Sequence, residues 1–345
     1  MMRLIICATQ VPFERGGAEA HVEGLRRALV ARGYPVEVVA LPFKWYPKRA
    51  LLASCLAWRL LDLSEANGQP IDMVIATKFP SYVVRHRNKV TWLIHQYRQA
   101  YDWYGTPLSD FSTSPEDVRV RQMIFEIDRR ALGECKRLFA NARNTAARLQ
   151  RFNGLSAEPL YPPSLYEGRL RCDGYDNTIL YLGRLDKAKR VDLLLRAMTH
   201  VPAGVRCLVA GIGPERASLE KLARELNLGE RVRFLGWVDD DTLVRLYAQC
   251  FAVFYTPLDE DYGYVTVEAF QSEKPVITAT DSGGVLEFVE DGVTGFVCPP
   301  DAVALGAQIA RLFADKGLCQ RMGKAGQERV RHIRWDTTVN RLLGP

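Results

Sequence analysis

With 345 residues, 48% of them hydrophobic and 25% charged, the chain has the composition of an ordinary soluble globular protein and the length for two domains. No uninterrupted apolar run reaches the length of a membrane span, and Met1–Cys7 is too short for the core of a signal peptide. The eight cysteines include no C-x-x-C pair, which favours buried, reduced thiols in a cytoplasmic protein over disulfides or zinc.

Positive charge is concentrated in the first half of the chain. Residues 1–165 hold 23 Lys and Arg against 15 Asp and Glu, a net charge of +8, whereas the whole chain carries +6. Such an imbalance bears on partners rather than on fold. It fits an anionic membrane surface or an anionic acceptor better than nucleic acid, for which the sequence contains no recognisable module.

The first elements follow a strand–loop–helix–strand order. Arg3–Ala8 predicts a short strand, residues 18–33 a helix that ends at a glycine, and Val36–Leu41 the next strand. The connecting loop, Phe13–Gly17, lacks the G-x-G-x-x-G spacing, and no carboxylate ends the second strand. These two features argue against a dinucleotide-binding dehydrogenase.

Residues 44–61 combine Lys44, Lys48 and Arg49 with several aromatic and aliphatic side chains. A basic amphipathic stretch of this kind can lie in a bilayer interface. A helix packed on the sheet of the first domain explains the same pattern equally well. The sequence leaves these two interpretations open.

A histidine stands at the end of a predicted strand. Ile71–Ala76 and Val90–Ile94 read as strands, and the basic run Arg85–Lys89 between them is expected to add surface charge. His95 follows the second strand directly, at the edge of a parallel sheet where ligands bind. Residues 100–122 predict irregular loops before the next helix.

Consecutive prolines mark the predicted boundary between two domains. Leu160–Ser164 is the linker, because adjacent prolines end regular structure, and it divides residues 1–164 from 165–330. The second domain begins with the strand Thr178–Leu182, which leads into the basic loop Gly183–Arg190. Basic residues at a strand end and a helix start are suited to binding a diphosphate.

Two carboxylates follow the next buried strand in and after a single loop. Glu260 lies in an acidic, glycine-bearing loop, and Glu268 lies in the helix that follows. A further strand, Pro275–Thr278, leads to Ser282–Gly284 at the predicted start of another helix, where free N–H groups favour an anion. Glu268 can accept hydrogen bonds from ribose hydroxyls and Glu260 from sugar hydroxyls, so the layout suits a sugar nucleotide.

The spacing Glu260-x7-Glu268, with Tyr262–Gly263 inside it and Thr280–Gly284 after it, resembles the donor signature of retaining GT-B glycosyltransferases of family four, the glycosyl transferases group 1. The resemblance covers the second half continuously, but the first half only at its start and around the strand-end histidine. It implies an α/β fold of two Rossmann-like domains facing across a cleft. Residues 331–345 are then a helix that crosses back to the first domain.

The resemblance also implies roles for residues that match the family's motifs. The implied catalytic set consists of His95, Arg184, Lys189 and Glu260. The implied donor-binding set consists of Gly16, Gly17, Gly213, Val238, Tyr262, Gly263, Tyr264, Val265, Glu268, Gly283 and Gly284. Two departures from the family pattern are expected to be harmless: Arg190, where the family often has glycine, as a solvated neighbour, and Glu273 as a solvent-facing turn residue.

The implied reaction moves a sugar, with retention, from a GDP-mannose-like or UDP-sugar donor to a saccharide acceptor. Arg184 and Lys189 would neutralise the leaving diphosphate, so neither a metal nor a cofactor is expected. The basic first half suggests a lipid-linked acceptor and a peripheral site on the cytoplasmic membrane face, in assembly of a surface polysaccharide such as lipopolysaccharide. The alternatives are a fully soluble transferase, a sugar-nucleotide epimerase or hydrolase on the same fold, and a non-catalytic partner subunit.

Overall fold

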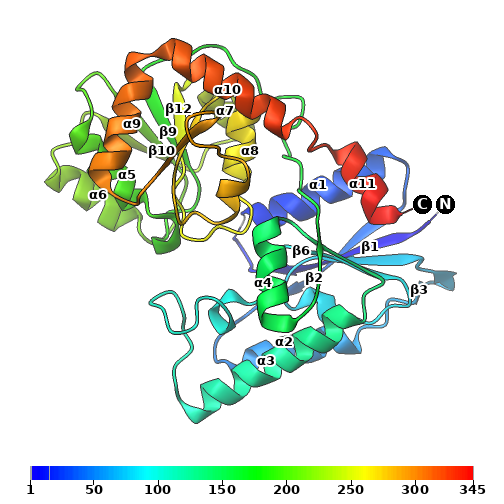
Figure 1. Ribbon diagram of the computed structural model, residues 1–345. Helices are drawn as coiled ribbons and strands as arrows, with labels where there is room; N and C mark the ends of the chain where they lie inside the picture. Colours follow the sequence, from blue (N-terminus) through cyan, green and yellow to red (C-terminus); the bar gives the residue numbers. More distant parts are fainter. Residues whose placement is uncertain (1, 15, 345) are drawn as a thin grey trace. The chain divides into compact units, whose positions relative to one another are not determined.

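The computed structural model describes residues 2–14 and 16–344, and the chain divides into two compact units (Figure 1). The first unit comprises Met1–Leu165 together with Ile333–Pro345, and the second comprises Tyr166–His332. Each unit contains one six-stranded sheet in which every pair of neighbouring strands is parallel. In the described part of the chain, no helix is both long and apolar enough to cross a membrane.

The sheet of the first unit has the strand order β2-β1-β5-β6-β7-β8. Its strands are β1 (Leu4–Gln10), β2 (Val36–Pro42), β5 (Met73–Ala76), β6 (Lys89–Leu93), β7 (Arg137–Ala140) and β8 (Glu158–Pro159), and a separate hairpin is formed by β3 (Glu65–Ala66) and β4 (Gln69–Pro70). Its helices are α1 (Gly17–Ala31), α2 (Arg49–Leu60), α3 (Pro115–Gly133), α4 (Arg143–Asn153) and α11 (Trp335–Leu343), with short 3-10 turns η1 (Ser81–Val83) and η2 (Arg98–Ala100).

The first unit has two hydrophobic cores that draw on different helices. Leu51 and Trp58 of α2 are buried in one core. In the other, Leu25 of α1 packs with Val339 and Leu342 of α11, which lies beside α1 (Figure 1). The last helix of the chain therefore completes a core that the first helix begins.

Two lysines from the basic stretches of the first unit make hydrogen bonds within that unit. Lys48 donates to the carbonyl of Asp110, and its Nζ lies 3.6 Å from the carboxylate of Asp117. Lys89 is 1% exposed and its Nζ donates to three backbone carbonyls. The expectation of surface charge is therefore wrong for Lys89.

The helix-packing interpretation of residues 44–61 is confirmed for the inner face of α2, while Leu56 and Leu60 on the same helix are exposed.

The prediction of irregular loops over residues 100–122 is wrong for its last part. Helix α3 begins at Pro115, because Ser114 caps it by accepting the N–H of Asp117 at 3.2 Å. Proline in the first turn and acidic residues near a helix N-terminus both favour this start. The local sequence Ser-Pro-Glu-Asp carries this signal.

The sheet of the second unit has the strand order β11-β10-β9-β12-β13-β14. Its strands are β9 (Thr178–Leu182), β10 (Arg206–Ala210), β11 (Val232–Gly236), β12 (Ala252–Phe254), β13 (Val276–Ala279) and β14 (Gly295–Cys298). Its helices are α5 (Val191–Ala197), α6 (Arg216–Glu225), α7 (Asp240–Gln249), α8 (Tyr264–Gln271), α9 (Ala302–Ala314) and α10 (Lys316–Val330), with 3-10 turns η3 (Lys187–Lys189), η4 (Met198–His200) and η5 (Gly284–Glu287).

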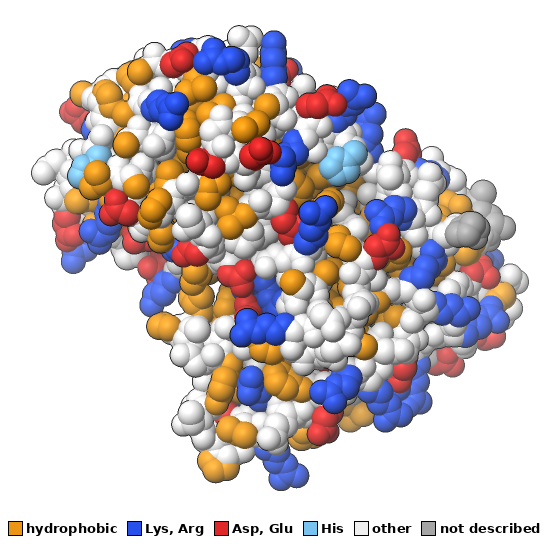
Figure 2. Space-filling model, in the orientation of Figure 1, with side chains coloured by type: hydrophobic (Ala, Val, Ile, Leu, Met, Phe, Trp, Pro, Cys, Tyr) orange, Lys and Arg blue, Asp and Glu red, His pale blue; other side chains and the backbone are white. Residues whose placement is uncertain are grey.

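The order of this second sheet reverses between β9 and β12. Strands β10 and β11 extend from one side of β9, and the chain then returns to add β12, β13 and β14 on the other side. The carboxyl ends of strands at such a reversal form the ligand-binding edge of open α/β sheets. On the face shown in Figure 2, charged side chains of both signs are interspersed with apolar ones, as in an ordinary globular protein.

Candidate functional site

Three loops of the second unit are joined by backbone hydrogen bonds at the carboxyl edge of its sheet. The N–H of Leu258, after β12, donates to the carbonyl of Ala188, after β9, at 2.7 Å. The N–H of Gly284, after β13, donates to the carbonyl of Glu260 at 2.8 Å. The loops after β9, β12 and β13 therefore form one connected surface.

Lys189, Glu260 and Tyr255 form a hydrogen-bonded cluster on this surface. The Nζ of Lys189 donates to Oε2 of Glu260 and lies 3.3 Å from Oη of Tyr255, which donates to the same Oε2 at 2.8 Å. Burial is the largest influence on the pKa of Lys189 and lowers it, but Glu260, together with Tyr181 and Asp186, outweighs burial, so the net shift of this pKa is upward. Lys189 is therefore an ammonium at neutral pH, and it can neutralise a bound anion.

Arg184 precedes Lys189 by five residues in the same loop, and its backbone is held by a hydrogen bond. Its side chain is 51% exposed, with Nε 3.7 Å from the carboxylate of Asp186. Its carbonyl accepts a hydrogen bond from Oη of the buried Tyr181 at 2.9 Å, which fixes the loop directly after β9. The loop after β9 thus carries a guanidinium and an ammonium five residues apart, an arrangement suited to a diphosphate.

Arg190 ties the loops together, so its expected role as a solvated neighbour is wrong. Its guanidinium makes two hydrogen bonds to the carboxylate of Asp281, at 2.7 and 2.6 Å, and also donates to the carbonyls of Thr256 and Pro257. The planar fork of arginine suits such a bidentate pair. The φ of Arg190 is 50°, in the left-handed region that favours glycine.

The second carboxylate is held by another buried tyrosine. Glu268 lies on α8, which follows Gly263 (φ 84°), and it is only 8% exposed. Its Oε2 accepts a hydrogen bond from Oη of Tyr247 on α7 at 3.0 Å. One turn earlier on α8, the hydroxyl of Tyr264 is buried and has no hydrogen-bond partner among the described residues. The sequence interpretation missed both Tyr247 and Tyr255. Tyr255 ends an apolar run and Tyr247 lies on the apolar face of an amphipathic helix, so a buried hydroxyl is the only signal of either.

The glycine turn after β13 forms a shorter element than predicted. Residues Gly284–Glu287 make the single 3-10 turn η5 instead of a full helix, and the N–H of Gly284 is already bonded to Glu260. A Cβ on Gly284 would lie 2.3 Å from the carbonyl oxygen of Asp261, so the two loops meet backbone to backbone. The N–H of Gly284 is therefore not available to an anion, and the prediction of a free helix N-terminus is wrong at this residue.

The remaining predicted residues of the second unit lie around the same edge. A Cβ on Gly213 would lie 2.3 Å from the carbonyl oxygen of Leu185, so this glycine permits a close approach of the loops after β9 and β10. Val238 is half-buried after β11, and Val265 is half-buried in the first turn of α8. Tyr262 is buried, with its ring packed edge-on against Tyr264 and Phe288, and Gly283 has φ 60° and ψ −125°.

Three predicted residues belong to the first unit. Gly16 is the N-cap of α1, which begins at Gly17, and its N–H donates to the carboxylate of Glu19 at 2.8 Å. His95 is half-buried after β6, with Nδ1 2.6 Å from the carbonyl of Gln96. All three follow strands β1 and β6 at the carboxyl edge of the first sheet. Arg15, in the predicted loop before α1, lies outside the described residues.

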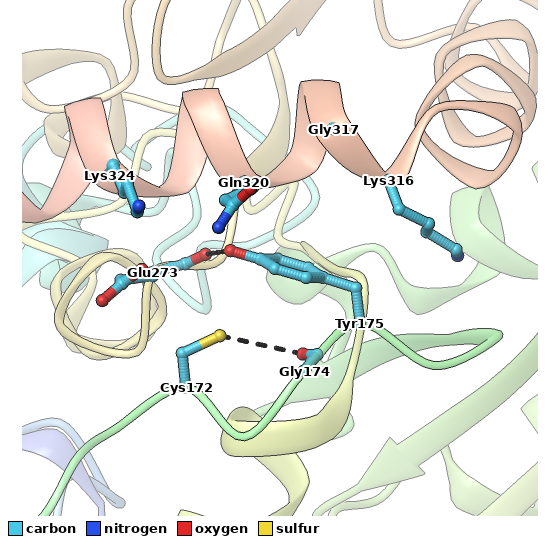
Figure 3. Close-up of a pocket in the computed structure, with 8 residues that line it drawn as sticks. All are labelled: Cys172, Gly174, Tyr175, Glu273, Lys316, Gly317, Gln320 and Lys324. Carbon is cyan, nitrogen blue, oxygen red and sulfur yellow. Dashed lines mark hydrogen bonds between the residues drawn. The ribbon is translucent and has the colours of Figure 1, made fainter.

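A pocket of about 560 Å³ lies at the opposite, amino edge of the second sheet (Figure 3). Lys274, which is buried beneath it, donates to Sγ of Cys172 at 3.1 Å and to the carbonyl of Gly174. Glu273 is half-buried in its lining and its carbonyl accepts from Oη of Tyr175 at 2.9 Å, so the expectation that Glu273 faces solvent is only partly met. The pocket shares no residue with the cluster around Lys189.

Among the described residues, no group of three or more His, Cys, Asp and Glu side chains is placed to hold a metal ion. The eight cysteines are unpaired, and six of them are buried.

Comparison with known proteins finds a family match over the second unit. Residues 168–329 match the family described as Glycosyl transferases group 1. The chain is 33% identical over 169 residues to the alpha-1,3/1,6-mannosyltransferase ALG2 of Homo sapiens, covering 44% of this chain and 40% of that protein. It is 31% identical over 241 residues to the D-inositol 3-phosphate glycosyltransferase of Mycobacterium marinum, covering 66% of this chain and 51% of that protein. The matched segments thus span about half the length of these relatives or less.

Solved structures extend the similarity to both units. Sucrose-phosphate synthase of Thermosynechococcus elongatus has a TM-score of 0.74 at 22% identity, over 98% of this chain and 97% of that one. Anabaena Alr3699/HepE in complex with UDP and glucose has a TM-score of 0.72 at 19% identity, over 98% of both chains. WaaG, a glycosyltransferase involved in lipopolysaccharide biosynthesis, has a TM-score of 0.68 at 16% identity, over 99% of this chain and 100% of that one. At these identities the likeness concerns the fold, and the predicted GT-B fold is confirmed.

Proposed function

We propose that this chain, whose second unit matches the glycosyl transferases group 1 family, moves a glycosyl group from a nucleoside-diphosphate sugar to a saccharide acceptor with retention at the anomeric carbon. The observation that carries the proposal is the cluster of Lys189, Glu260 and Tyr255 beside Arg184, at the reversal of the second sheet. It combines cations for a diphosphate with a carboxylate for hydroxyl groups.

In this proposal each charged group has a separate task. Arg184 and Lys189 stabilise the negative charge that develops on the leaving diphosphate, which is the kind of electrostatic help that usually contributes most to catalysis and requires no metal. Glu260, oriented by Tyr255, accepts hydrogen bonds from hydroxyls of the transferred sugar. Glu268, oriented by Tyr247, accepts hydrogen bonds from the ribose. His95, after β6 of the first unit, is proposed as a further catalytic residue.

Two kinds of donor are in keeping with the relatives. ALG2 is named as a mannosyltransferase, and Anabaena Alr3699/HepE was solved with UDP and glucose. We therefore propose either a GDP-mannose-like donor or a UDP-sugar. The alternative of a sugar-nucleotide epimerase or hydrolase would consume donor rapidly with no acceptor present, whereas a transferase would need the acceptor.

A thermal-shift screen of nucleoside diphosphates tests the donor site. A ligand that binds only the folded protein raises the melting temperature by mass action, so one of GDP and UDP should do so strongly. GDP would indicate a mannose or fucose donor, and UDP a wider set. No shift with any nucleoside diphosphate would contradict the proposed function. The control is Lys187→Ala, which removes an exposed charge from η3 and should respond as the wild type does.

We further propose a peripheral site of action on the cytoplasmic membrane face, with a lipid-linked saccharide as acceptor in surface polysaccharide assembly. Support comes from the net charge of +8 in residues 1–165 and from the similarity to WaaG, which is involved in lipopolysaccharide biosynthesis. On the outer face of α2, Leu56 and Leu60 are 57% and 74% exposed and lie four residues apart, and the same helix begins at the exposed Arg49.

Vesicle flotation should show binding to anionic membranes that weakens as salt is added. Each basic residue near an anionic surface contributes about 1 kcal/mol, so Arg49→Glu should lower the bound fraction, and Leu56→Ser/Leu60→Ser should lower it further. The matched control is Ile212→Ser, which changes an exposed apolar residue of the second unit. Absence of wild-type binding at low salt would contradict the membrane proposal and leave the transferase proposal standing.

A further inference from the structure

A second concave site lies in the first unit, at the opposite end of strand β6 from His95. It is a pocket of about 470 Å³ at the amino edge of the first sheet. Strand β6 begins at Lys89 in the lining of this pocket, and its other end leads to His95. The pocket and the strand-end histidine are therefore separated by the length of a strand. All of the side chains in the lining are charged or polar.

Positive charge exceeds negative charge in this pocket. Its lining contributes four cations and two carboxylates: Arg59, Arg85, Arg87 and Lys89, with Asp62 and Glu134. Glu134 is shared among the cations, because it accepts two hydrogen bonds from Arg59, each at 2.6 Å, and also lies 3.6 Å from Nζ of Lys89. One carboxylate thus compensates two cations, and the excess charge of a concave surface attracts anions.

A buried lysine contributes to this excess from a fixed position. Lys89 donates to the carbonyls of Tyr82, Val84 and Ala131, at 3.0, 3.1 and 2.8 Å, so its ammonium is fixed in place. Carbonyl groups solvate a cation but do not cancel its charge. Glu134, which Lys89 shares with Arg59, compensates this charge only in part, so an anion in the pocket would meet positive charge from the floor as well as from the rim.

Two arginines on the rim have no partner of their own. Arg85 and Arg87 are exposed, and their side chains make no hydrogen bond or ion pair with any other residue that the structure describes. Between them, His86 is held by its ring: the N–H of Asn88 donates to Nδ1, and Nε2 lies 3.1 Å from the carbonyl of Ile71. The backbone that carries both arginines is thus anchored, whereas their guanidinium groups are available for a ligand.

We propose that this pocket is a binding site for a phosphate-bearing anion, a phosphomonoester or a diphosphate, gripped by Arg85 and Arg87. Guanidinium groups match the geometry of phosphate oxygens and bind them in a bidentate manner. The volume is within the range of small-ligand sites, and the polar lining suits a headgroup or a small polar ester better than an acyl chain. The phosphate can come from the headgroup of an anionic lipid or from a soluble ester.

Isothermal titration with inorganic pyrophosphate at low ionic strength tests the site. The variant Arg85→Ser/Arg87→Ser should bind pyrophosphate at least about tenfold more weakly than the wild type, since it loses two charge-assisted donors. It should keep the wild-type melting temperature, because neither side chain bonds to a described residue. The matched control is Arg119→Ser/Arg129→Ser, which removes two exposed arginines of α3 and the same charge, and should bind within about twofold of the wild type.

The donor site proposed above also attracts diphosphates, so Lys189→Ala is titrated in parallel. A binding event that survives Lys189→Ala and is lost in Arg85→Ser/Arg87→Ser belongs to the pocket and supports the proposal. Unchanged binding in Arg85→Ser/Arg87→Ser, or an equal loss in the control on α3, would overturn it. Either result leaves the proposed transferase activity untouched.

Vesicles distinguish the two sources of phosphate once that event is found. If wild-type binding to phosphatidylglycerol vesicles is competed by pyrophosphate and is weaker in Arg85→Ser/Arg87→Ser, the ligand is a lipid headgroup. If vesicle binding is the same in the two proteins while pyrophosphate binding differs, the ligand is a soluble ester. Phosphatidylcholine vesicles, which carry no net charge, are the control.

Discussion

Replacing Lys189 with alanine should lower kcat by about 100- to 1000-fold, the usual cost of removing one donor to a developing negative charge. Lys189 lies against Glu260 at the reversal of the second sheet, and its raised pKa keeps it charged. An upward shift means that the ammonium and its contribution to stability are present at neutral pH and are lost only as pH rises through the raised pKa. Steady-state kinetics with saturating donor and acceptor measure the effect.

Two variants of residues near Lys189 provide comparisons for this loss of kcat. Tyr255→Phe removes one hydrogen bond to Glu260 and leaves Lys189 in place, so a smaller loss, about tenfold, is expected in kcat. Lys187→Ala removes a charge two residues away on the same 3-10 turn and should leave kcat within about twofold of the wild type. A Lys189→Ala protein with the wild-type melting temperature and only a few-fold loss of kcat would refute the diphosphate role.

The Glu268→Ala variant should bind the nucleoside diphosphate about 100-fold more weakly, because a carboxylate that accepts two hydroxyl hydrogen bonds is lost. Glu260→Ala should leave that affinity near the wild-type value and instead impair turnover of the sugar donor. Calorimetry with the nucleoside diphosphate identified by thermal shift, and kinetics with the intact donor, separate the two effects.

Variants that test folding accompany the Glu268→Ala measurement. Glu268→Ala leaves the hydroxyl of the buried Tyr247 without its acceptor, whereas Glu268→Gln keeps an oxygen for it, so the melting temperatures of the two variants are compared first. Tyr247→Phe keeps Glu268 and should weaken nucleotide binding only about fivefold, through loss of orientation. Equal nucleotide affinity in wild type and Glu268→Ala would contradict the division of labour between the two carboxylates.

The sequence predicts the fold well because the order of elements is a local property. Alternating apolar strands and amphipathic helices indicate two α/β sheets, and the similarity to solved structures confirms the GT-B fold. The spacing of Glu260 and Glu268 also follows from a local strand–loop–helix unit, which the structure contains as β12, its loop and α8. The catalytic roles of these residues remain predictions.

Contacts between distant loops were beyond the reach of sequence patterns. Arg190 bonds to Asp281, 91 residues away, and nothing near Arg190 in the sequence indicates that pairing. The same holds for Tyr247 and Glu268, which lie on different helices. Lys89 belongs to a run of charges that looks solvated, yet carbonyl groups from three separate positions converge on its Nζ. Tertiary structure decides the surroundings of each of these groups.

The interleaving of the two units has a consequence for biosynthesis. Helix α11 leaves the ribosome only after the whole second unit, yet its Val339 and Leu342 fill the core that α1 begins, and a Cβ on Gly24 of α1 would lie 2.2 Å from the ring of Trp335. At translation rates of about 5 to 20 residues per second, synthesis of the second unit delays this closure by roughly ten to thirty seconds. The nascent first unit therefore waits with Leu25 and its neighbours uncovered, a target for chaperones, while the second unit is free to fold.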